Sequence, residues 1–257
     1  MPPFEHARYP SLQDRPVLIT GGGTGIGAAF VQAFAQQGAR VQFLDIDDEA
    51  SQALAASLQG QRHAPRYTHC DLTDLAALQA VLAQVQADGA VQVLINNAAN
   101  DVRHDITDVS AEFWQRNIEV NLRHLFFCAQ AVVPGMRAAG GGAIVNLGSI
   151  SWHLAQTRLA LYMSAKAGIE GLTRGLARDL GADGIRVNTL VPGAIRTPKQ
   201  TRLWHSPEEE QRILAGQCLK ARVEPEDVAA MALFLASDSA RHCSGREYFV
   251  DGGWFGA

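Results

Sequence analysis

The sequence predicts a single-domain α/β protein with a doubly wound, seven-stranded parallel sheet and helices on both faces. Short β-rich apolar runs alternate with longer stretches of helical periodicity along the whole chain, as right-handed crossovers between parallel strands require. Most of these runs are continuously apolar, which is typical of strands buried on both faces. A glycine-rich turn, residues 21–27, separates the first expected strand from the first expected helix.

The expected elements follow one another without a repeat or an interdomain linker. We predict strands at residues 17–20, 41–45, 66–70, 91–96, 143–147, 185–191 and 247–250. We predict helices at 25–37, 48–59, 74–87, 109–138, 160–181 and 224–237. Residues 1–14 are expected to form a flexible N-terminal arm. Residues 193–223, which we call the lid segment, interrupt the rhythm and are expected to carry one short helix over a site.

Composition restricts the classes of function. The chain has 257 residues, 47% of them apolar, which is enough for one sizeable core within 1–257. Its net charge of −4 has no basic block, which argues against nucleic acid and membrane surfaces as partners. Four cysteines without CxxC spacing, and no signal-peptide pattern, favour a cytoplasmic protein with reduced thiols. No cluster of His, Cys and Asp has the spacing of metal ligands, so no metal site is predicted.

The turn at residues 21–27 predicts a binding site for a dinucleotide. Gly21 permits the tight turn, Gly25 lets the backbone approach a pyrophosphate, and Gly27 allows close packing of helix and strand. The N-terminus of the following helix offers free N–H groups and a positive dipole end to phosphate. The alternative is a glycine-rich turn without a ligand, but the order strand, turn, helix favours the binding site.

Acidic and amide side chains after the next strands predict which dinucleotide binds. Asp45 ends the second strand, where a carboxylate accepts from a ribose 2′-hydroxyl and repels a 2′-phosphate, so NAD is preferred and NADP use is weaker. Asp45 could instead cap the next helix, and Arg40 could favour NADP if it reached the site. Asp71 could accept from the adenine amino group or equally cap the next turn. Asn97 could brace the sheet and the adenosine half of the cofactor.

Tyr162 and Lys166 are candidate acid–base residues. They lie four residues apart in the expected helix 160–181 and therefore share one face. A tyrosine with its ordinary pKa near 10 is a poor base at neutral pH, and a nearby ammonium stabilises the phenolate. Ser149 follows a strand, where its hydroxyl could hold the reacting oxygen, and Asn121 is a candidate link in a proton path. A Tyr–Lys pair alone is usually a surface feature, but this ordered set indicates hydride transfer involving a hydroxylated carbon.

These motifs resemble the short-chain dehydrogenase/reductase family over essentially the whole chain. The resemblance implies a Rossmann fold, Tyr162 as the acid/base, Lys166 on the nicotinamide ribose, Ser149 orienting the substrate, and Asn121 holding a relay water through its backbone. One departure is Ala99, where the family commonly has glycine. The cofactor site expected from the motifs and the resemblance comprises Tyr162, Lys166 and Gly21, Thr24, Gly25, Ile26, Gly27, Asp45, Ile46, Asp71, Leu72, Asn97, Ala98, Pro192, Gly193, Ile195 and Thr197.

Four segments resemble the bacterial aldose 1-dehydrogenases of this family, chiefly those that act on D-xylose and L-arabinose. They are residues 100–104, 121–124, 148–153 and 217–220. Polar side chains clustered after the strand ends suit the hydroxyls of a sugar better than an apolar substrate. Trp152 could equally be a core residue, His153 a loop histidine, and Arg103 with His104 a solvated loop. The expected substrate site is Asn100, Asp101, Arg103, Ser149, Ser151, Trp152, His153, Gln156 and Tyr162.

The sequence thus predicts an NAD(P)-dependent aldose 1-dehydrogenase that oxidises the anomeric carbon of a pentose to the aldonolactone, with Tyr162 as base. An L-fucose or other sugar or polyol dehydrogenase is the nearest alternative, since one methyl group decides only about 1–3 kcal/mol. A thioester reductase is disfavoured by Asp45. A non-catalytic NAD-binding sensor would not need Ser149, Tyr162 and Lys166 together. Apolar positions on several faces of helices 109–138 and 160–181 suggest subunit contacts, and the family resemblance implies a dimer or, as we expect, a homotetramer.

Overall fold

The computed structural model describes residues 7–204 and 206–256 and contains the predicted parallel sheet. Its seven strands run in the order β3-β2-β1-β4-β5-β6-β7, and all neighbours pair in parallel. The doubly wound fold class is therefore confirmed. The strands are β1 (Pro16–Thr20), β2 (Arg40–Asp45), β3 (Arg66–His69), β4 (Val93–Asn96), β5 (Gly142–Leu147), β6 (Ile185–Pro192) and β7 (Glu247–Val250).

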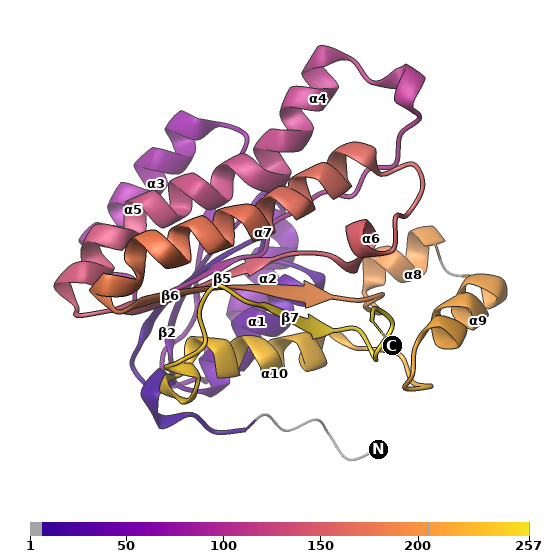
Figure 1. Ribbon diagram of the computed structural model, residues 1–257. Helices are drawn as coiled ribbons and strands as arrows, with labels where there is room; N and C mark the ends of the chain where they lie inside the picture. Colours follow the sequence, from indigo (N-terminus) through magenta and orange to yellow (C-terminus); the bar gives the residue numbers. More distant parts are fainter. Residues whose placement is uncertain (1–6, 205, 257) are drawn as a thin grey trace.

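Helices cover both faces of the sheet (Figure 1). One face carries α1 (Gly25–Gln36), α2 (Asp48–Ser57) and α10 (Pro225–Ala236). The other carries α3 (Leu75–Ala87), α5 (His124–Ala138) and α7 (Ala160–Leu180). All of them except α5 agree with the expected helices to within a few residues, because each has an apolar stripe facing the sheet.

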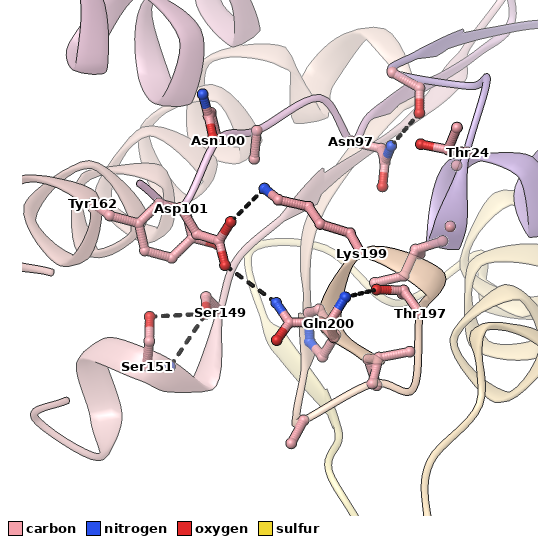
Figure 2. A pocket seen from close by; sticks show the side chains of 18 of the residues that line it. Thr24, Asn97, Asn100, Asp101, Ser149, Ser151, Tyr162, Thr197, Lys199 and Gln200 are labelled. Atoms are coloured by element: carbon pink, nitrogen blue, oxygen red, sulfur yellow. Dashed lines mark hydrogen bonds and ion pairs between the residues drawn. The ribbon is translucent and has the colours of Figure 1, made fainter. Parts of the chain in front are cut away.

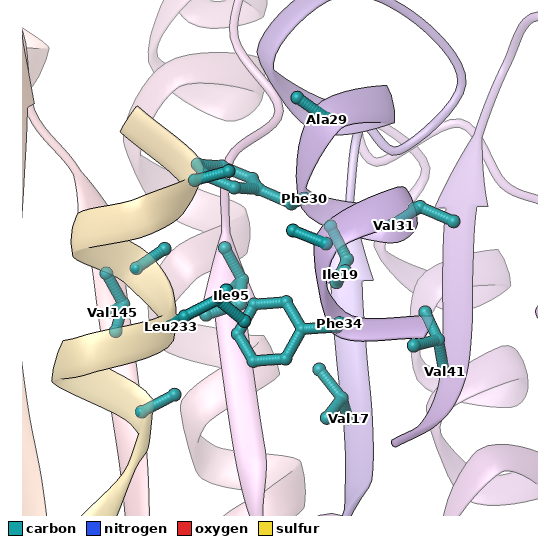
Figure 3. Close-up of a cluster of buried hydrophobic side chains, with 14 of the residues drawn as sticks. Val17, Ile19, Ala29, Phe30, Val31, Phe34, Val41, Ile95, Val145 and Leu233 are labelled. Carbon is teal, nitrogen blue, oxygen red and sulfur yellow. The ribbon is translucent and has the colours of Figure 1, made fainter. Parts of the chain in front are cut away.

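The core between α1, α10 and the sheet fixes the position of the glycine-rich turn. Phe30 and Phe34 on α1 are fully buried and lie beside Leu233 of α10 and Ile19 of β1 (Figure 3). Burial of one such aromatic ring stabilises the fold by about 1.5–3 kcal/mol. The start of α1 is thereby held at the end of β1, where the turn lies.

The expected helix 109–138 is interrupted. It begins at α4 (Ala111–Ile118), where the Ser110 hydroxyl accepts from the Phe113 N–H, and continues through a π-helical turn at Glu119–Arg123 into α5. Inside this turn the Asn121 amide donates to the Asn117 carbonyl, at 3.0 Å. The wider turn brings Asn121 into the interior, a feature that helical periodicity does not reveal.

Short helices at the carboxyl ends of the strands complete the fold. Ser149 caps the single-turn helix α6 (Ile150–His153). The lid segment contains two helices, α8 (Pro198–Trp204) and α9 (Pro207–Gly216), so the prediction of one short helix is wrong. The second forms because Ser206 caps it and Pro207 occupies its first position.

The N-terminal segment needs a correction. Residues 1–6 of the expected arm lie outside the described residues, but the rest of it packs on the domain. Leu12 is fully buried in a 3₁₀ turn at Pro10–Leu12, and Asp14 pairs with Arg62 and His63. Among the helices described, none combines the length and apolar character needed to cross a membrane.

Candidate active site

A cavity of about 730 Å³ opens at the carboxyl ends of the strands, below α8 and α9. The polar segments after β1, β2, β4, β5 and β6 all reach it, as expected for an open α/β sheet. It is lined by every expected cofactor residue except Lys166, namely Gly21, Thr24, Gly25, Ile26, Gly27, Asp45, Ile46, Asp71, Leu72, Asn97, Ala98, Tyr162, Pro192, Gly193, Ile195 and Thr197.

The glycine-rich turn has the geometry of a phosphate cradle. Gly21 has φ +66°, and a Cβ on Gly27 would lie 1.8 Å from the Gly21 oxygen. The Asn97 amide donates to the Gly21 carbonyl at 2.7 Å and braces the turn against β4. Thr24, the N-cap of α1, makes no side-chain capping bond, so its side chain does not cover the N–H groups of this helix end. These residues fit a dinucleotide pyrophosphate.

Asp45 does not cap the following helix. Its Oδ2 accepts from the Gly23 N–H at 2.8 Å, and its Oδ1 accepts from the Ile46 and Asp47 N–H groups. The cap of α2 is Asp47, so this alternative for Asp45 is wrong. A carboxylate has about four acceptor sites, which leaves room for a ribose hydroxyl. Arg40 begins β2 and lies at the opposite end of that strand, away from the cavity.

Asp71 lines the cavity but also serves its own turn. Its Oδ1 accepts from the N–H and the hydroxyl of Thr73, at 2.9 and 2.7 Å. These hydrogen bonds lower the pKa of Asp71, so the carboxylate is ionised beside the cavity at neutral pH. Asp74, not Asp71, caps α3. The local turn therefore explains this residue, and an acceptor position toward the cavity remains compatible with it.

Ser149, Tyr162 and Lys166 come together where β5 meets α7. Tyr162 faces the cavity close to Ser149, whose Oγ lies 2.8 Å from the Ser151 Oγ (Figure 2). Lys166 is buried beneath the tyrosine, with its Nζ 5.5 Å from the ring centroid. The ammonium donates to the Leu147 carbonyl at 2.7 Å. The spacing of one helical turn and the end of one strand create this contact.

Burial dominates the electrostatics of this pair. It raises the pKa of Tyr162, the Asp101 charge raises it further, and the Ser149 hydroxyl acts in the opposite direction. Burial also lowers the pKa of Lys166 to about 7, against a raising effect of Asp101. The prediction that Lys166 lowers the tyrosine pKa is therefore wrong for this structure, because desolvation raises it.

Asp101 is held by the lid segment. Its Oδ1 lies 2.6 Å from the Lys199 Nζ, and its Oδ2 accepts from the Gln200 amide at 3.1 Å (Figure 2). Burial would raise the pKa of Asp101, but the Lys199 ammonium overrides it and the pKa is lowered. A charged carboxylate therefore faces the cavity beside Tyr162.

Asn121 is fully buried and does not line the cavity. Its amide donates to the Asn100 carbonyl at 3.0 Å, and its Oδ1 accepts from the Asn100 N–H at 2.8 Å. The side chain thus fixes the loop that leads from β4 to Asp101. Because the side chain is engaged with Asn100, the expected proton relay could involve only the backbone of Asn121.

The structure divides the expected substrate residues. Those that line the cavity are Asn100, Asp101, Arg103, Ser149, Ser151, Gln156 and Tyr162. Trp152 and His153 do not: both bind the Glu170 carboxylate, at 2.8 and 3.0 Å, so their assignment to the substrate site is wrong. They point away because α6 turns its C-terminal end toward α7. His104 is buried against Phe113 and is not part of a solvated loop.

Several charged residues of the lid segment line the cavity, although they were not predicted as site residues from the sequence. They are Lys199, Arg202, Glu209, Glu210, Arg212 and Arg222, together with the uncharged Gln200. The only signal for them was the high charge density of the lid segment, which does not tell which face turns inward.

Comparisons with known proteins agree with this geometry. A family model described as enoyl-(acyl carrier protein) reductase matches residues 21–255. The chain is 56% identical to D-xylose 1-dehydrogenase of Caulobacter vibrioides, over 96% of this chain and 98% of the relative. It is 47% identical to a probable galactose dehydrogenase of Rhizobium meliloti, over 97% and 98%.

Solved structures give the same result. A gluconate 5-dehydrogenase from Burkholderia cenocepacia in complex with NADP and tartrate has a TM-score of 0.88 at 29% identity, covering 95% of this chain and 97% of that one. A protein described as belonging to the short chain dehydrogenase/reductase family has a TM-score of 0.86 at 32% identity, covering 96% and 100%. The chain belongs to the short-chain dehydrogenase/reductase family.

Proposed function

We propose that this protein is an NAD-dependent aldose 1-dehydrogenase that oxidises the anomeric carbon of a pentose, D-xylose or L-arabinose, to the aldonolactone. The observation that supports this best is the placement of Ser149 and Tyr162 against a cavity wall of polar side chains. Asn100, Asp101 and Gln156 on that wall offer donors and acceptors to several hydroxyls. The 56% identity to a D-xylose 1-dehydrogenase supports the same substrate class.

The family uses NAD or NADP, and the residues at the adenosine end favour NAD. Asp45, Asp47 and Asp71 line that end of the cavity, so a 2′-phosphate would meet carboxylates. Arg40, the basic residue that could have reversed the preference, lies at the far end of β2. The nicotinamide ring supplies the hydride acceptor when bound. The gluconate 5-dehydrogenase structure contains NADP, so we also expect a weaker activity of this protein with NADP.

In the proposed reaction, Ser149 and Tyr162 hold the anomeric hydroxyl of the cyclic sugar. The hydroxyl proton passes to the Tyr162 oxygen in its ionised, phenolate form, the C1–H bond breaks as hydride is transferred to the bound nicotinamide, and C1 and its oxygen become the lactone carbonyl. Lys166, with its pKa lowered to about 7, can take up and release a proton near neutral pH. We propose that the proton leaves through Lys166 toward the backbone of Asn121.

A hexose of the galactose type is the second candidate, because of the 47% identity to a probable galactose dehydrogenase. L-Fucose belongs to the same comparison, since an extra methyl group changes binding by only about 1–3 kcal/mol. Initial rates of NADH formation from D-xylose, L-arabinose, D-galactose, L-fucose and D-glucose separate them. We expect strong activity on one or two pentoses and lower rates with NADP. Tight NAD binding without turnover of any aldose would leave a sensor or another alcohol substrate instead.

We also propose a homotetramer in which the lid segment covers the substrate. Trp114 on α4 and Phe126 on α5 are exposed apolar side chains, 51% and 43% accessible, on the long interrupted helix. Exposed aromatics of this size are typical of interfaces. The chain end packs on its own molecule, since Phe255 contacts His153 and Trp254 stacks on Arg212. Light scattering after gel filtration measures the mass of the particle in solution. We expect the mass of a tetramer, and the mass of a monomer would contradict the proposal.

A further inference from the structure

A buried polar cluster lies behind the cavity wall, and the proposed reaction does not use it. Its centre is Glu170 on α7, whose Oε1 accepts from the Trp152 indole N–H at 2.8 Å and lies 3.0 Å from the His153 Nε2. Glu247 on β7 is the third titratable residue of the cluster, after Glu170 and His153. Glu170 is only 6% exposed, so these contacts are made in the protein interior.

The charges of the cluster are balanced from within. Glu247 pairs with Arg174 at 2.6 Å, and Glu170 is hydrogen-bonded to Glu247. Burial raises the pKa of Glu170 to about 7, and the Glu247 charge raises it further against Trp152 and Arg174. Burial lowers the pKa of His153, opposed by Glu247 and Asp251. A carboxyl group that shares a proton with its neighbour can accept from Trp152 and His153 at the same time.

A metal ion is the alternative occupant of this cluster. Donor atoms of His153, Glu170 and Glu247 lie within 4.8 Å of one another. However, the Trp152 N–H already occupies Glu170, and the Arg174 guanidinium already occupies Glu247. Because protein donors serve both carboxyl groups, the cluster is complete as a hydrogen-bonded unit.

The cluster connects directly to the proposed catalytic residues. Tyr162, Lys166 and Glu170 follow one another at four-residue intervals on α7 and share a face of the helix. Helix α6 is a single turn that starts at the Ser149 cap and ends at His153. Glu170 therefore holds the C-terminal end of the same turn whose N-terminal end presents the Ser149 hydroxyl to Tyr162.

We propose that Glu170 is a positioning residue, which fixes α6 on α7 and so sets the distance between the Ser149 hydroxyl and the Tyr162 oxygen. The kinetic part of this inference rests on the proposed function. Ring contacts of His153 with Phe249 and Phe255, at 4.9 and 4.5 Å, pack the other side of α6 but supply no hydrogen bond. The two bonds to Glu170 thus determine the orientation of the turn. Misplacement of a reacting group by about 1 Å costs on the order of 100-fold in rate.

The test compares Glu170→Gln with Glu170→Leu. Glutamine keeps an acceptor for Trp152 and His153 and a donor for Glu247, so we expect kcat on the pentose to stay within about threefold of the wild type. Leucine keeps the bulk but removes the acceptor, and we expect kcat to fall about 10- to 100-fold with the Kd for NAD unchanged. Thr173→Val is the matched control, because Thr173 is buried on α7 but bonds to Asn146 and Thr189 of the sheet.

A second readout does not depend on turnover. Release of α6 should expose Trp152, so the fluorescence assigned to it by difference from Trp152→Phe should shift to longer wavelength in Glu170→Leu. It should stay unshifted in Glu170→Gln and Thr173→Val. If neither the wild type nor any variant oxidises a sugar, the proposed function fails. The shift of the Trp152 emission still decides whether Glu170 positions α6. If Glu170→Leu does not fold, Trp152→Phe removes one of the two bonds and should lower kcat severalfold.

Three results would overturn the inference. One is equal kcat loss in Glu170→Gln and Glu170→Leu. Another is a loss in Glu170→Leu no larger than in Thr173→Val. The third is an unshifted Trp152 emission in Glu170→Leu, which would mean that α6 keeps its place without the carboxyl group.

Discussion

Lys199 and Asp101 form an ion pair, with Nζ 2.6 Å from Oδ1, that joins the first lid helix to the loop after β4. The two residues are far apart in the sequence, and both side chains are partly exposed at the cavity. The Asp101 charge raises the pKa of Tyr162, and the adjacent Lys199 ammonium opposes that effect. The pair therefore connects the lid segment to the surroundings of Tyr162, the proposed acid–base residue.

Lys199→Met should raise KM for the sugar and shift the pH dependence of kcat/KM upward. Without the ammonium, the Asp101 charge acts fully on Tyr162, so the base ionises at higher pH. Because the pair is partly exposed, its effect is at most about 1 kcal/mol, or about fivefold. Lys199→Arg keeps the charge and serves as the control. Identical pH profiles of the two variants would show that the pair has no such influence.

Asp45→Ala should weaken NAD and narrow its advantage over NADP. Loss of a charged acceptor for the ribose costs about 1.5–3 kcal/mol, which is about 10- to 100-fold in KM for NAD. Asp74→Ala is the control, since Asp74 caps α3 without lining the cavity, and its loss should lower stability by about 1 kcal/mol. The measurement is the ratio of kcat/KM for NAD to kcat/KM for NADP. An unchanged ratio in Asp45→Ala would refute the assignment of Asp45 as the acceptor of the ribose hydroxyl.

Gly27→Ala should destabilise the fold by about 3 kcal/mol or prevent folding. Its Cβ would lie 1.8 Å from the Gly21 oxygen and 2.8 Å from the Asn97 amide, and the backbone atom cannot yield. Gly171→Ala on α7 is the control, because nothing lies within 4 Å of its Cβ. That change should stabilise by about 0.5–1 kcal/mol. Free energies of unfolding in urea measure both, and a Gly27→Ala variant as stable as the wild type would contradict the close packing.

His124 should make stability fall between neutral and acidic pH. Burial, and then the Lys166 charge, lower the pKa of this fully buried imidazole to about 3, whereas the unfolded chain has about 6.5. Between these values the unfolded state binds a proton that the folded state does not. Stability is thus present above pH 6.5 and is lost, by at most about 1.4 kcal/mol per pH unit, as pH falls toward 3.

His124→Leu tests this pH dependence. Unfolding free energies of this variant should vary less between pH 6.5 and 5 than those of the wild type, whatever the change in absolute stability. Parallel curves for the two proteins would exclude His124 as the source.

The sheet and the cofactor end were predictable because their signals are local. Buried parallel strands read as apolar runs, and the glycine turn and Asp45 follow strands within a few residues. The substrate side of the site was harder to predict from the sequence, because it depends on how elements far apart in the chain pack together. Trp152 and His153 are polar residues next to Ser149, yet the buried Glu170 turns them away. Lys199 and Gln200 enter the site only through the fold of the lid segment. Neither contact has a signature in spacing.

The most direct test of the central proposal uses D-xylose deuterated at C1, incubated with NAD and either the wild type or Tyr162→Phe. With the wild type, we expect reduced cofactor one mass unit heavier than NADH, because hydride leaves from C1. Tyr162→Phe should bind NAD with similar affinity but form almost none of this product. Absence of deuterium from the reduced cofactor, or undiminished turnover by Tyr162→Phe, would contradict oxidation of the anomeric carbon with Tyr162 as the base.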